Sequence, residues 1–311
     1  MNLEILSSQE ILNKLIQRPI HPWEHNYLAH YSSYWDGIST DPRILLIPVD
    51  DHIVHRGDGV FEAFRLINNS FYLLDQHLTR LRHSADSIGL YVPWSDSELK
   101  QLIEKLAKAA GESHLIFRLF VSRGQGGFTT NPYESHAPQL TLIACRFKPV
   151  TQEKYQSGVF IGRSKYLQKP EPYATIKSCN YLPNVLMKKE AVDRNLDFVV
   201  AFNNQSYLTE SSTENIFLLN NQNELLHPHF GSILKGTTLV RCLELAKLKL
   251  NIPHREANIT EQDLLQAKEV FMAGTTLDIL PVSRYESKTY EVGPVGQALN
   301  QLIQQDQRSK I

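Results

Sequence analysis

The chain has 311 residues, with 32 Lys and Arg against 33 Asp and Glu, so its formal net charge at pH 7 is −1. This balance argues against a general nucleic-acid binder, which would carry an excess of basic residues. Hydrophobic residues make up 42% of the chain and charged residues 21%, as in an ordinary globular protein that can bury a large core without staples.

The cysteines and the apolar runs indicate a compartment. Cys145, Cys179 and Cys242 are scattered and form no Cys-x-x-Cys pair, so we expect neither a disulfide framework nor a thiolate metal site. The first twenty residues lack the apolar core of a secretion signal, and the longest apolar runs are too short to span a bilayer. We therefore expect a protein of the cytoplasm that binds neither membrane nor nucleic acid.

The first half of the chain predicts an N-terminal extension, residues 1–40, which we take as peripheral, and a small α+β domain, residues 41–148. Apolar residues recur with the periods of strands and helices. In chain order the predicted elements are a helix at 8–17, strands at 44–49, 59–66 and 71–74, a helix beginning at Asp75 as its N-cap, a helix at 97–110, and strands at 115–122 and 139–146. The turn Asn68-Asn69-Ser70 predicts a hairpin between the second and third of these strands.

The second half predicts a larger α/β domain, residues 158–311. Residues 149–157 are polar and without a strong period, and we take them as the interdomain linker. The elements predicted after them are a strand at 159–161, a helix from Pro183 to about residue 195, strands at 197–203 and 207–219, a helix at 239–250, a helix opened by a capping box at 260–263, and a strand at 269–273.

Two Gly-Thr-Thr turns are candidate anion-binding elements. Gly236-Thr237-Thr238 precedes a predicted helix, and Gly274-Thr275-Thr276 follows a predicted strand. Glycine lets the backbone approach a ligand, threonine hydroxyls can donate, and a helix N-terminus offers free N–H groups to an anion. Two such turns suggest one phosphate held from two sides, although ordinary turn and cap chemistry would produce the same pattern.

Lys177 and Glu210 are candidates for the chemistry itself. Lys177 has small and apolar neighbours, and desolvation there would lower its pKa and make the amine nucleophilic. The alternative is a lysine at a strand edge whose charged end reaches solvent. Glu210 stands among hydroxyl residues between strand-like runs, where a carboxylate could hold a proton on a ring nitrogen, or could simply face solvent.

Three arginines are candidate anion ligands. Arg80 falls away from the apolar stripe of its predicted helix, so it is either exposed or a clamp on phosphate. Arg118 and Arg123 bracket a strand end, where they could bind a substrate carboxylate or form ordinary salt bridges. The segment Asp50-Asp51-His52 with His55 favours a solvated loop over a metal site, so we expect no metal.

Six motifs occur in a fixed order between about residues 42 and 283. They are HRGDGVFE at 55–62, HLTRL at 77–81, IKSCNYL at 176–182, TESSTENIF at 209–217, LKGTT at 234–238 and EVFMAGT at 269–275. Together they resemble the class IV, or fold type IV, pyridoxal-phosphate enzymes. Six motifs in the correct order are far more specific than any one of them. The stretch from residue 31 to 59 most resembles the plant-type D-amino-acid aminotransferase branch.

The resemblance implies the fold and a role for each candidate residue. It implies a small α+β domain and a larger α/β domain with pyridoxal 5'-phosphate between them, in a homodimer that completes each site. Lys177 would bond covalently to the cofactor, Glu210 would contact its pyridine nitrogen, and Tyr181 would lie near its ring oxygen. The residues implied for the phosphate are Arg80, Thr237, Thr238 and Thr275, and the candidates for the substrate are Phe61, Arg118, Arg123 and Thr276.

The resemblance also implies an aminotransferase that moves an amino group between an amino acid, here of the D-type, and a 2-keto acid. Aminodeoxychorismate lyase, which releases pyruvate and 4-aminobenzoate, is an alternative, because residues 122–127 and 180–184 also occur in lyase-like members. A branched-chain aminotransferase is another, although Arg56 stands where that group usually carries an aromatic residue. A non-catalytic binding protein on this fold is disfavoured, because the lysine and the phosphate residues are present.

Overall fold

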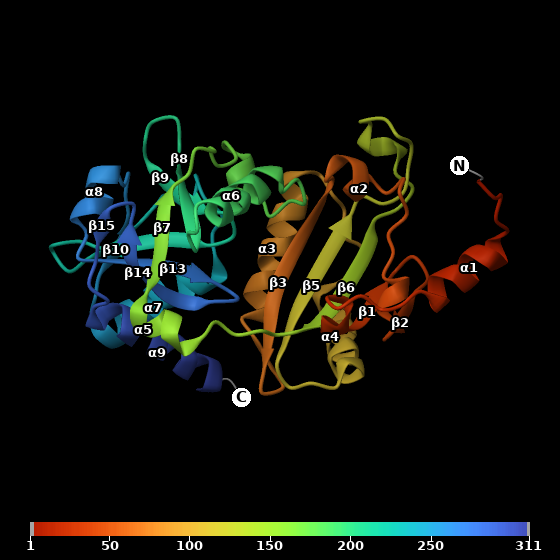
Figure 1. The fold of residues 1–311 in the computed structure, drawn as a ribbon, viewed down its shortest axis with the longest axis horizontal. Coiled ribbons are helices and arrows are strands. Elements are labelled where there is room, and N and C mark those ends of the chain that lie inside the picture. Colours follow the sequence, from red (N-terminus) through yellow and green to blue (C-terminus); the bar gives the residue numbers. More distant parts are fainter. Residues whose placement is uncertain (1–2, 310–311) are drawn as a thin grey trace.

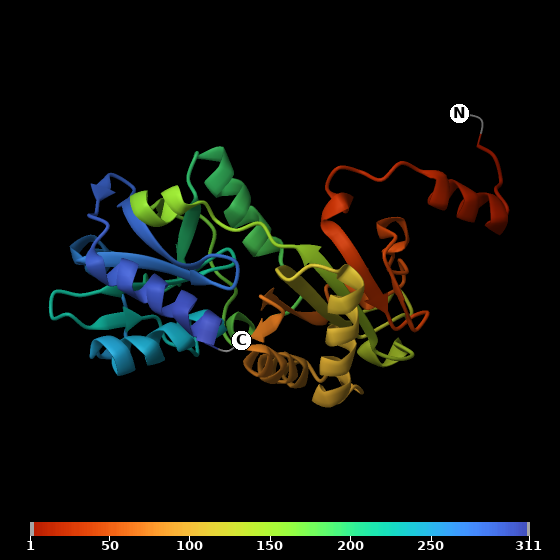
Figure 2. The ribbon, with the colours of Figure 1, turned by 90° about the horizontal axis from the view of Figure 1, so that it is seen from below.

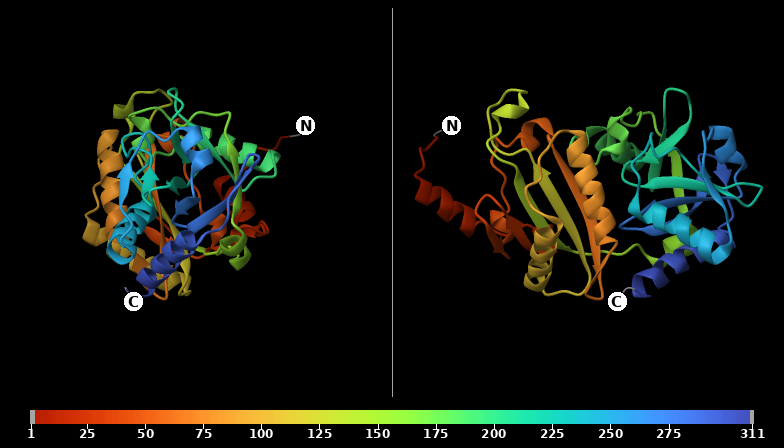
Figure 3. Two further views of the ribbon diagram at one scale, coloured as in Figure 1. Left: turned by 90° about the vertical axis from the view of Figure 1, so that its left-hand side faces the viewer. Right: turned by 180° about the vertical axis from the view of Figure 1, so that it is seen from behind.

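Two β-sheets divide the chain into a small N-terminal part and a larger C-terminal part (Figure 1). The structure is a computed structural model and describes residues 3–309. Helix α1 projects from the end of the small part, far from the larger sheet (Figures 1 and 3). Among residues 3–309, none of the helices combines the length and the apolar character needed to cross a bilayer.

The small part is built on one antiparallel sheet of six strands. Its elements, with 3-10 helices labelled η, are α1 (Ser8–Gln17), η1 (Glu24–Asn26), β1 (Tyr27–Ser32), β2 (Gly37–Ser39), η2 (Pro42–Ile44), α2 (His52–Arg56), β3 (Gly59–Ile67), β4 (Ser70–Tyr72), α3 (Leu74–Ser87), α4 (Asp96–Ala110), β5 (Leu115–Ser122), η3 (Pro132–Glu134) and β6 (Gln139–Arg146). The strand order is β2-β1-β6-β5-β3-β4.

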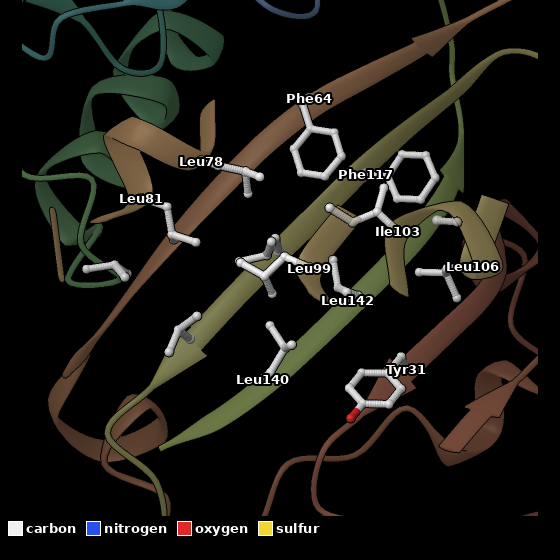
Figure 4. Packing of buried hydrophobic residues seen from close by; sticks show 14 of the residues in the cluster. Tyr31, Phe64, Leu78, Leu81, Leu99, Ile103, Leu106, Phe117, Leu140 and Leu142 are labelled. Atoms are coloured by element: carbon white, nitrogen blue, oxygen red, sulfur yellow. The ribbon is translucent and has the colours of Figure 1, made fainter. Parts of the chain in front are cut away.

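Helices α3 and α4 cover one face of this sheet (Figure 2). Strand side chains alternate between the two faces, so every second residue of β5 joins the core beneath the helices. Phe117 and Leu119 do so, together with Leu78 of α3 and Ile103 of α4 (Figure 4). The intervening residues of β5, among them Arg118, face the opposite side of the sheet.

Three predictions for the small part are wrong. The run at 44–49 forms no strand, because no neighbouring strand pairs with it. Ile44 ends η2, and Leu46, Ile47 and Val49 in the irregular segment after it are exposed. The N-terminal forty residues are not all peripheral, since β1 and β2 join the sheet and Ala29 lies in the core. Asp75 is not an N-cap: α3 begins at Leu74 after Leu73, and Asp75 lies in its first turn, where its charge favours the helix dipole.

The larger part carries a mixed sheet of nine strands. Its elements are α5 (Gln152–Ser157), β7 (Val159–Arg163), η4 (Tyr173–Thr175), α6 (Leu182–Asp193), β8 (Phe198–Phe202), β9 (Leu208–Ser211), β10 (Asn215–Leu219), β11 (Leu225–His227), α7 (Thr237–Leu250), β12 (His254–Glu256), α8 (Glu261–Gln266), β13 (Glu269–Gly274), β14 (Asp278–Tyr285), β15 (Lys288–Thr289) and α9 (Pro294–Ser309).

Six of these strands close into a ring in the order β10-β13-β14-β7-β8-β9, because Glu210 of β9 pairs with Asn215 of β10. Alternation again divides the side chains between two cores. Met272 of β13 packs with the inner cluster of the ring, whereas its neighbour Phe271 packs outside it, against residues of α7 and α9. The predicted combination of an α+β part with an α/β part is confirmed.

Two details of the larger part differ from expectation. The predicted strand at 207–219 is two strands, because a tight turn with the Ser211 N–H donating to the Glu214 carbonyl (2.9 Å) reverses the chain. Two-thirds of the predicted linker, residues 149–157, forms α5 (Gln152–Ser157), which packs against β14. No prediction covered β14 or α9.

We expect Phe117→Ala to lower the free energy of unfolding by about 3 to 5 kcal/mol, because the ring is fully buried and stacks on Phe64 at 5.4 Å. Leu248→Ala, at a 72% exposed position of α7, is the matched control and should change it by less than about 0.5 kcal/mol. Urea unfolding followed by circular dichroism measures both. Equal effects of the two substitutions would contradict this assignment of the core.

Candidate active site

A cavity lies where the two parts of the chain meet. Arg80 of α3 lines it from the small part, and the larger part contributes the rest of its lining. The residues from the larger part are Lys177, Glu210, Thr213, Asn215, Leu234, Gly236, Thr237, Thr238, Ala273, Gly274 and Thr275. The structure thus brings together six of the residues singled out in the sequence: Arg80, Lys177, Glu210, Thr237, Thr238 and Thr275.

Lys177 is held at this junction by its own backbone. The Phe61 N–H of β3 donates to the Lys177 carbonyl (3.0 Å), and the Cys179 N–H donates to the Gly59 carbonyl (2.9 Å). On the other side, the Lys177 N–H donates to Ser84 Oγ of α3 (3.1 Å). These hydrogen bonds attach the segment before α6 to β3 and α3 of the small part, and they fix the position from which the lysine side chain extends.

The amine of Lys177 is desolvated. The residue is 9% exposed, and Nζ lies 4.5 Å from the ring centroid of Phe61. Burial, reinforced by the positive charge of Arg80, lowers the pKa of Lys177 to about 8. The unprotonated amine, which a nucleophile or a general base requires, is therefore far more abundant near neutral pH than in an exposed lysine.

Glu210 lies at the end of β9 with polar donors around its carboxylate. Oε2 accepts from the Leu234 N–H (3.2 Å) and from Asn215 Nδ2 (3.3 Å), and Oε1 accepts from Gln168 Nε2. Burial nevertheless raises the pKa of Glu210 to about 7. A cationic N–H group placed against this carboxylate would favour its charged form.

The N-terminus of α7 forms another wall of the cavity. Gly236 is the N-cap and has no side chain that could accept a hydrogen bond. The backbone N–H groups of Thr237 and Thr238 in the first turn are therefore available to donate to a ligand. A Cβ on Gly236 would lie 1.9 Å from Asn215 Oδ1, so this turn needs glycine. With Arg80 opposite and Thr275 from the turn after β13, this wall suits an anion.

Tyr181, Phe61 and Arg118 stand next to this cavity. The ring of Tyr181 lies 5.1 Å from that of Phe61, and burial raises the pKa of its phenol. Phe61 and Arg118 line an adjoining cavity of about 710 Å³ on the open face of the small sheet. The backbone of Arg118 pairs within the small sheet, but within residues 3–309 its guanidinium makes no hydrogen bond or ion pair, so it has donors for a ligand.

Arg123 and Thr276 are placed differently. Arg123 donates to both oxygens of Asp58 (2.6 and 3.0 Å) and to the carbonyls of Ile88 and Gly89, so its donors are largely engaged within the protein. Thr276 is exposed in the turn between β13 and β14 and does not line the cavity. In the described part of the chain, no group of His, Cys, Asp or Glu side chains could hold a metal ion.

Sequence reasoning missed four polar side chains around this cavity: Glu62, His77, Gln168 and Asn215. Gln168 and Asn215 hold Glu210, whereas Glu62 and His77 lie behind Arg80. Glu62 left a signal, because it is a carboxylate inside the apolar run of β3. Gln168 left none, since its loop reaches Glu210 only in three dimensions.

Comparisons with known proteins give the family to which the chain is similar. Residues 59–285 match the family model described as amino-transferase class IV. A D-amino-acid transaminase, chloroplastic, of Arabidopsis thaliana is 32% identical over 320 residues, which cover 99% of this chain and 83% of that protein. A D-alanine aminotransferase of Listeria monocytogenes serotype 4b (strain F2365) is 32% identical over 249 residues, covering 77% of this chain and 82% of the relative.

Solved structures share the fold. A branched-chain amino acid aminotransferase from T.th., crystallised with pyridoxamine 5'-phosphate, superposes with a TM-score of 0.85 at 22% identity, covering 92% of this chain and 95% of that one. A putative 4-amino-4-deoxychorismate lyase from Legionella pneumophila superposes with a TM-score of 0.77 at 23% identity, covering 84% of this chain and 95% of that one.

We expect Lys177 to react with acetic anhydride in the cofactor-free protein with a midpoint near pH 8, because its buried amine loses its proton there. The reactive form gains population as pH rises through this pKa. Peptide mass spectrometry across about pH 6–11 measures the labelling, with Lys189, an exposed lysine whose pKa is raised by Asp193, as the control. A Lys177 midpoint at or above that of Lys189 would contradict the assignment.

Proposed function

The chain belongs to the class IV aminotransferases, and on that premise we propose that it transfers the amino group of a D-amino acid to a 2-keto acid. Enzymes of this family act with pyridoxal 5'-phosphate on small amino acids and keto acids. The observation that carries the proposal is the cavity in which a desolvated lysine lies together with a buried carboxylate and an anion-binding helix N-terminus.

The residues of the cavity fit this cofactor. Lys177 offers an amine for its aldehyde, and the α7 N-terminus with Arg80 and Thr275 offers donors for its phosphate. Glu210, whose burial disfavours an unpaired charge, would gain a partner in the pyridine N–H. Gly236 supports the fit, because a Cβ there would lie 1.9 Å from Asn215 Oδ1 and displace the Asn215 side chain, which contacts Glu210.

We assign the chemical roles accordingly. When bound, the cofactor draws the electron pair at the substrate Cα into its ring. With the cofactor bound, Lys177 Nζ, unprotonated in a large fraction near pH 8, would take the proton from the substrate Cα and deliver it to the cofactor carbon that receives the amino group. Glu210 would keep a proton on the ring nitrogen of the bound cofactor, and Tyr181, with its phenol protonated, lies beside Lys177 and Phe61.

The substrate enters, in this proposal, from the adjoining cavity. Arg118 has donors free for the substrate carboxylate, and Phe61 and Phe120 provide an apolar wall for its side chain. Arg123 and Thr276, engaged and exposed respectively, are secondary candidates. A D-amino acid as the donor is supported by the identity to the Arabidopsis D-amino-acid transaminase and to the Listeria D-alanine aminotransferase.

We also propose that the protein is a homodimer and that it works in the cytoplasm. Of the 24 exposed large apolar side chains in the described residues, 14 belong to residues 3–54, from the segment before α1 through to α2. Exposed apolar surface of this extent is typical of a protein interface. The three cysteines are free, as expected of a reducing compartment.

We expect purified protein with pyridoxal 5'-phosphate to transfer the amino group of D-alanine to 2-oxoglutarate, and Lys177→Ala to lower the rate by at least about 100-fold because the base is lost. Coupled detection of pyruvate measures the reaction, and Lys189→Ala is the control. Cofactor-loaded Lys177→Ala with near wild-type turnover would contradict the role of the lysine. Amino transfer from L-leucine but not from D-alanine would contradict the D-amino-acid substrate and favour a branched-chain aminotransferase. Release of 4-aminobenzoate from aminodeoxychorismate would contradict it in favour of the lyase.

We expect light scattering to give twice the mass of one chain, and Ile47→Asp to shift the protein toward monomer because a buried interfacial charge is costly. Leu248→Asp, at a 72% exposed apolar position of α7, is the control and should leave the mass unchanged. A wild-type protein that is monomeric at micromolar concentration would contradict the homodimer.

A further inference from the structure

Two buried titratable side chains lie behind the cavity and have no part in the chemistry assigned above. Glu62 of β3 is 0% exposed and His77 of α3 is 2% exposed. Both belong to the small part of the chain, yet they lie beside the N-terminus of α7 in the larger part, where we place the phosphate. Burying a carboxylate is costly unless cationic groups and donors surround it, so its presence needs a structural reason.

Glu62 fixes the plane of the Arg80 guanidinium. Arg80 Nε donates to Glu62 Oε1 and Arg80 Nη2 donates to Glu62 Oε2, both at 2.7 Å, in a two-point contact that allows one orientation. Burial alone would raise the pKa of Glu62, but Arg80 and His77 lower it to about 2, so the carboxylate is charged at every working pH. The third donor, Nη1, reaches the Lys235 carbonyl at 3.1 Å, one residue before the turn at Gly236.

His77 carries the same constraint to α7. Its Nδ1 lies 2.7 Å from Glu62 Oε2, and its Nε2 lies 3.2 Å from Thr237 Oγ1. Burial lowers the pKa of His77 and favours the neutral ring. Because the carboxylate can only accept, Nδ1 is the donor, and Nε2 must then accept the hydroxyl proton of Thr237. The backbone N–H of Thr237 is left for the anion.

The charge of Glu62 opposes anion binding. It offsets the charge of Arg80, so the pair presents almost no net charge to a phosphate. An arrangement selected for attraction alone would leave Arg80 unpaired. Glu62 instead contributes geometry, since through Arg80, His77 and Thr237 it aligns donors from both parts of the chain on one point.

We propose that Glu62 and His77 are positioning residues for the phosphate group, which hold Arg80 and the first turn of α7 in register across the junction of the two parts. This inference rests on the proposed function, because the phosphate is that of pyridoxal 5'-phosphate. It requires Glu62 to act on the phosphate end of the cofactor and not on its aldehyde or ring.

The test compares two ligands that differ by the phosphate. Cofactor-free wild type and Glu62→Gln are titrated with pyridoxal 5'-phosphate and with pyridoxal, and binding is followed by absorbance. Glu62→Gln should weaken the phosphorylated ligand at least about tenfold, the loss of one charge-assisted hydrogen bond, and leave pyridoxal unchanged. It should also shift the 31P resonance of the bound phosphate.

Glu190→Gln is the matched control, because Glu190 is 7% exposed and pairs with Arg194 at 3.0 Å away from the cavity. It should change neither affinity. His77→Asn, which keeps a donor toward Glu62 and loses the contact to Thr237, should weaken the phosphorylated ligand by about threefold, and it serves as the test if Glu62→Gln does not fold.

Equal weakening of both ligands, or none, would overturn the positioning role. Wild-type protein that binds neither ligand would instead overturn the proposed function, so the two failures are distinguishable.

Discussion

The chemistry proposed for this protein depends on keeping one lysine amine out of water at the junction of two sheets. Lys177 stays there because its backbone pairs with β3 and because Phe61 covers its side chain. Low solvation lowers the pKa of the amine, and the same low dielectric strengthens the electrostatic interactions among the charged groups around it. The neighbouring charges are therefore paired where they can be: Arg80 forms an ion pair with Glu62. Burial raises the pKa of Glu210, and a cationic group beside this carboxylate would favour its charged form.

Much of the fold could be predicted because, in strands and helices that bury one face, apolar residues recur with the period of the element. Strands β5 and β6 and helix α1 lie at the predicted residues. Prediction failed where an apolar run has no partner, as at 44–49, and where a strand reverses in a tight turn, as between β9 and β10. Periodicity reports which residues are apolar, but not whether a neighbouring strand exists or where the chain turns back.

The site was predictable to the extent that its residues lie in motifs. The lysine, Glu210 and both Gly-Thr-Thr turns carry local signals, and the order of six motifs gives them a family context. The residues that hold them in place carry little signal, because Gln168 and His77 act on partners 42 and 160 residues away. Arg123 shows the converse, since its local context suggested a ligand role while Asp58, 65 residues away, engages it.

The covalent bond that we propose between Lys177 and pyridoxal 5'-phosphate can be tested directly. Borohydride reduction of the cofactor-loaded enzyme makes that bond permanent, and peptide mass mapping then locates it. The account predicts a single phosphopyridoxyl adduct on Lys177. An adduct on another lysine, Lys169 included, or no adduct at all would contradict it.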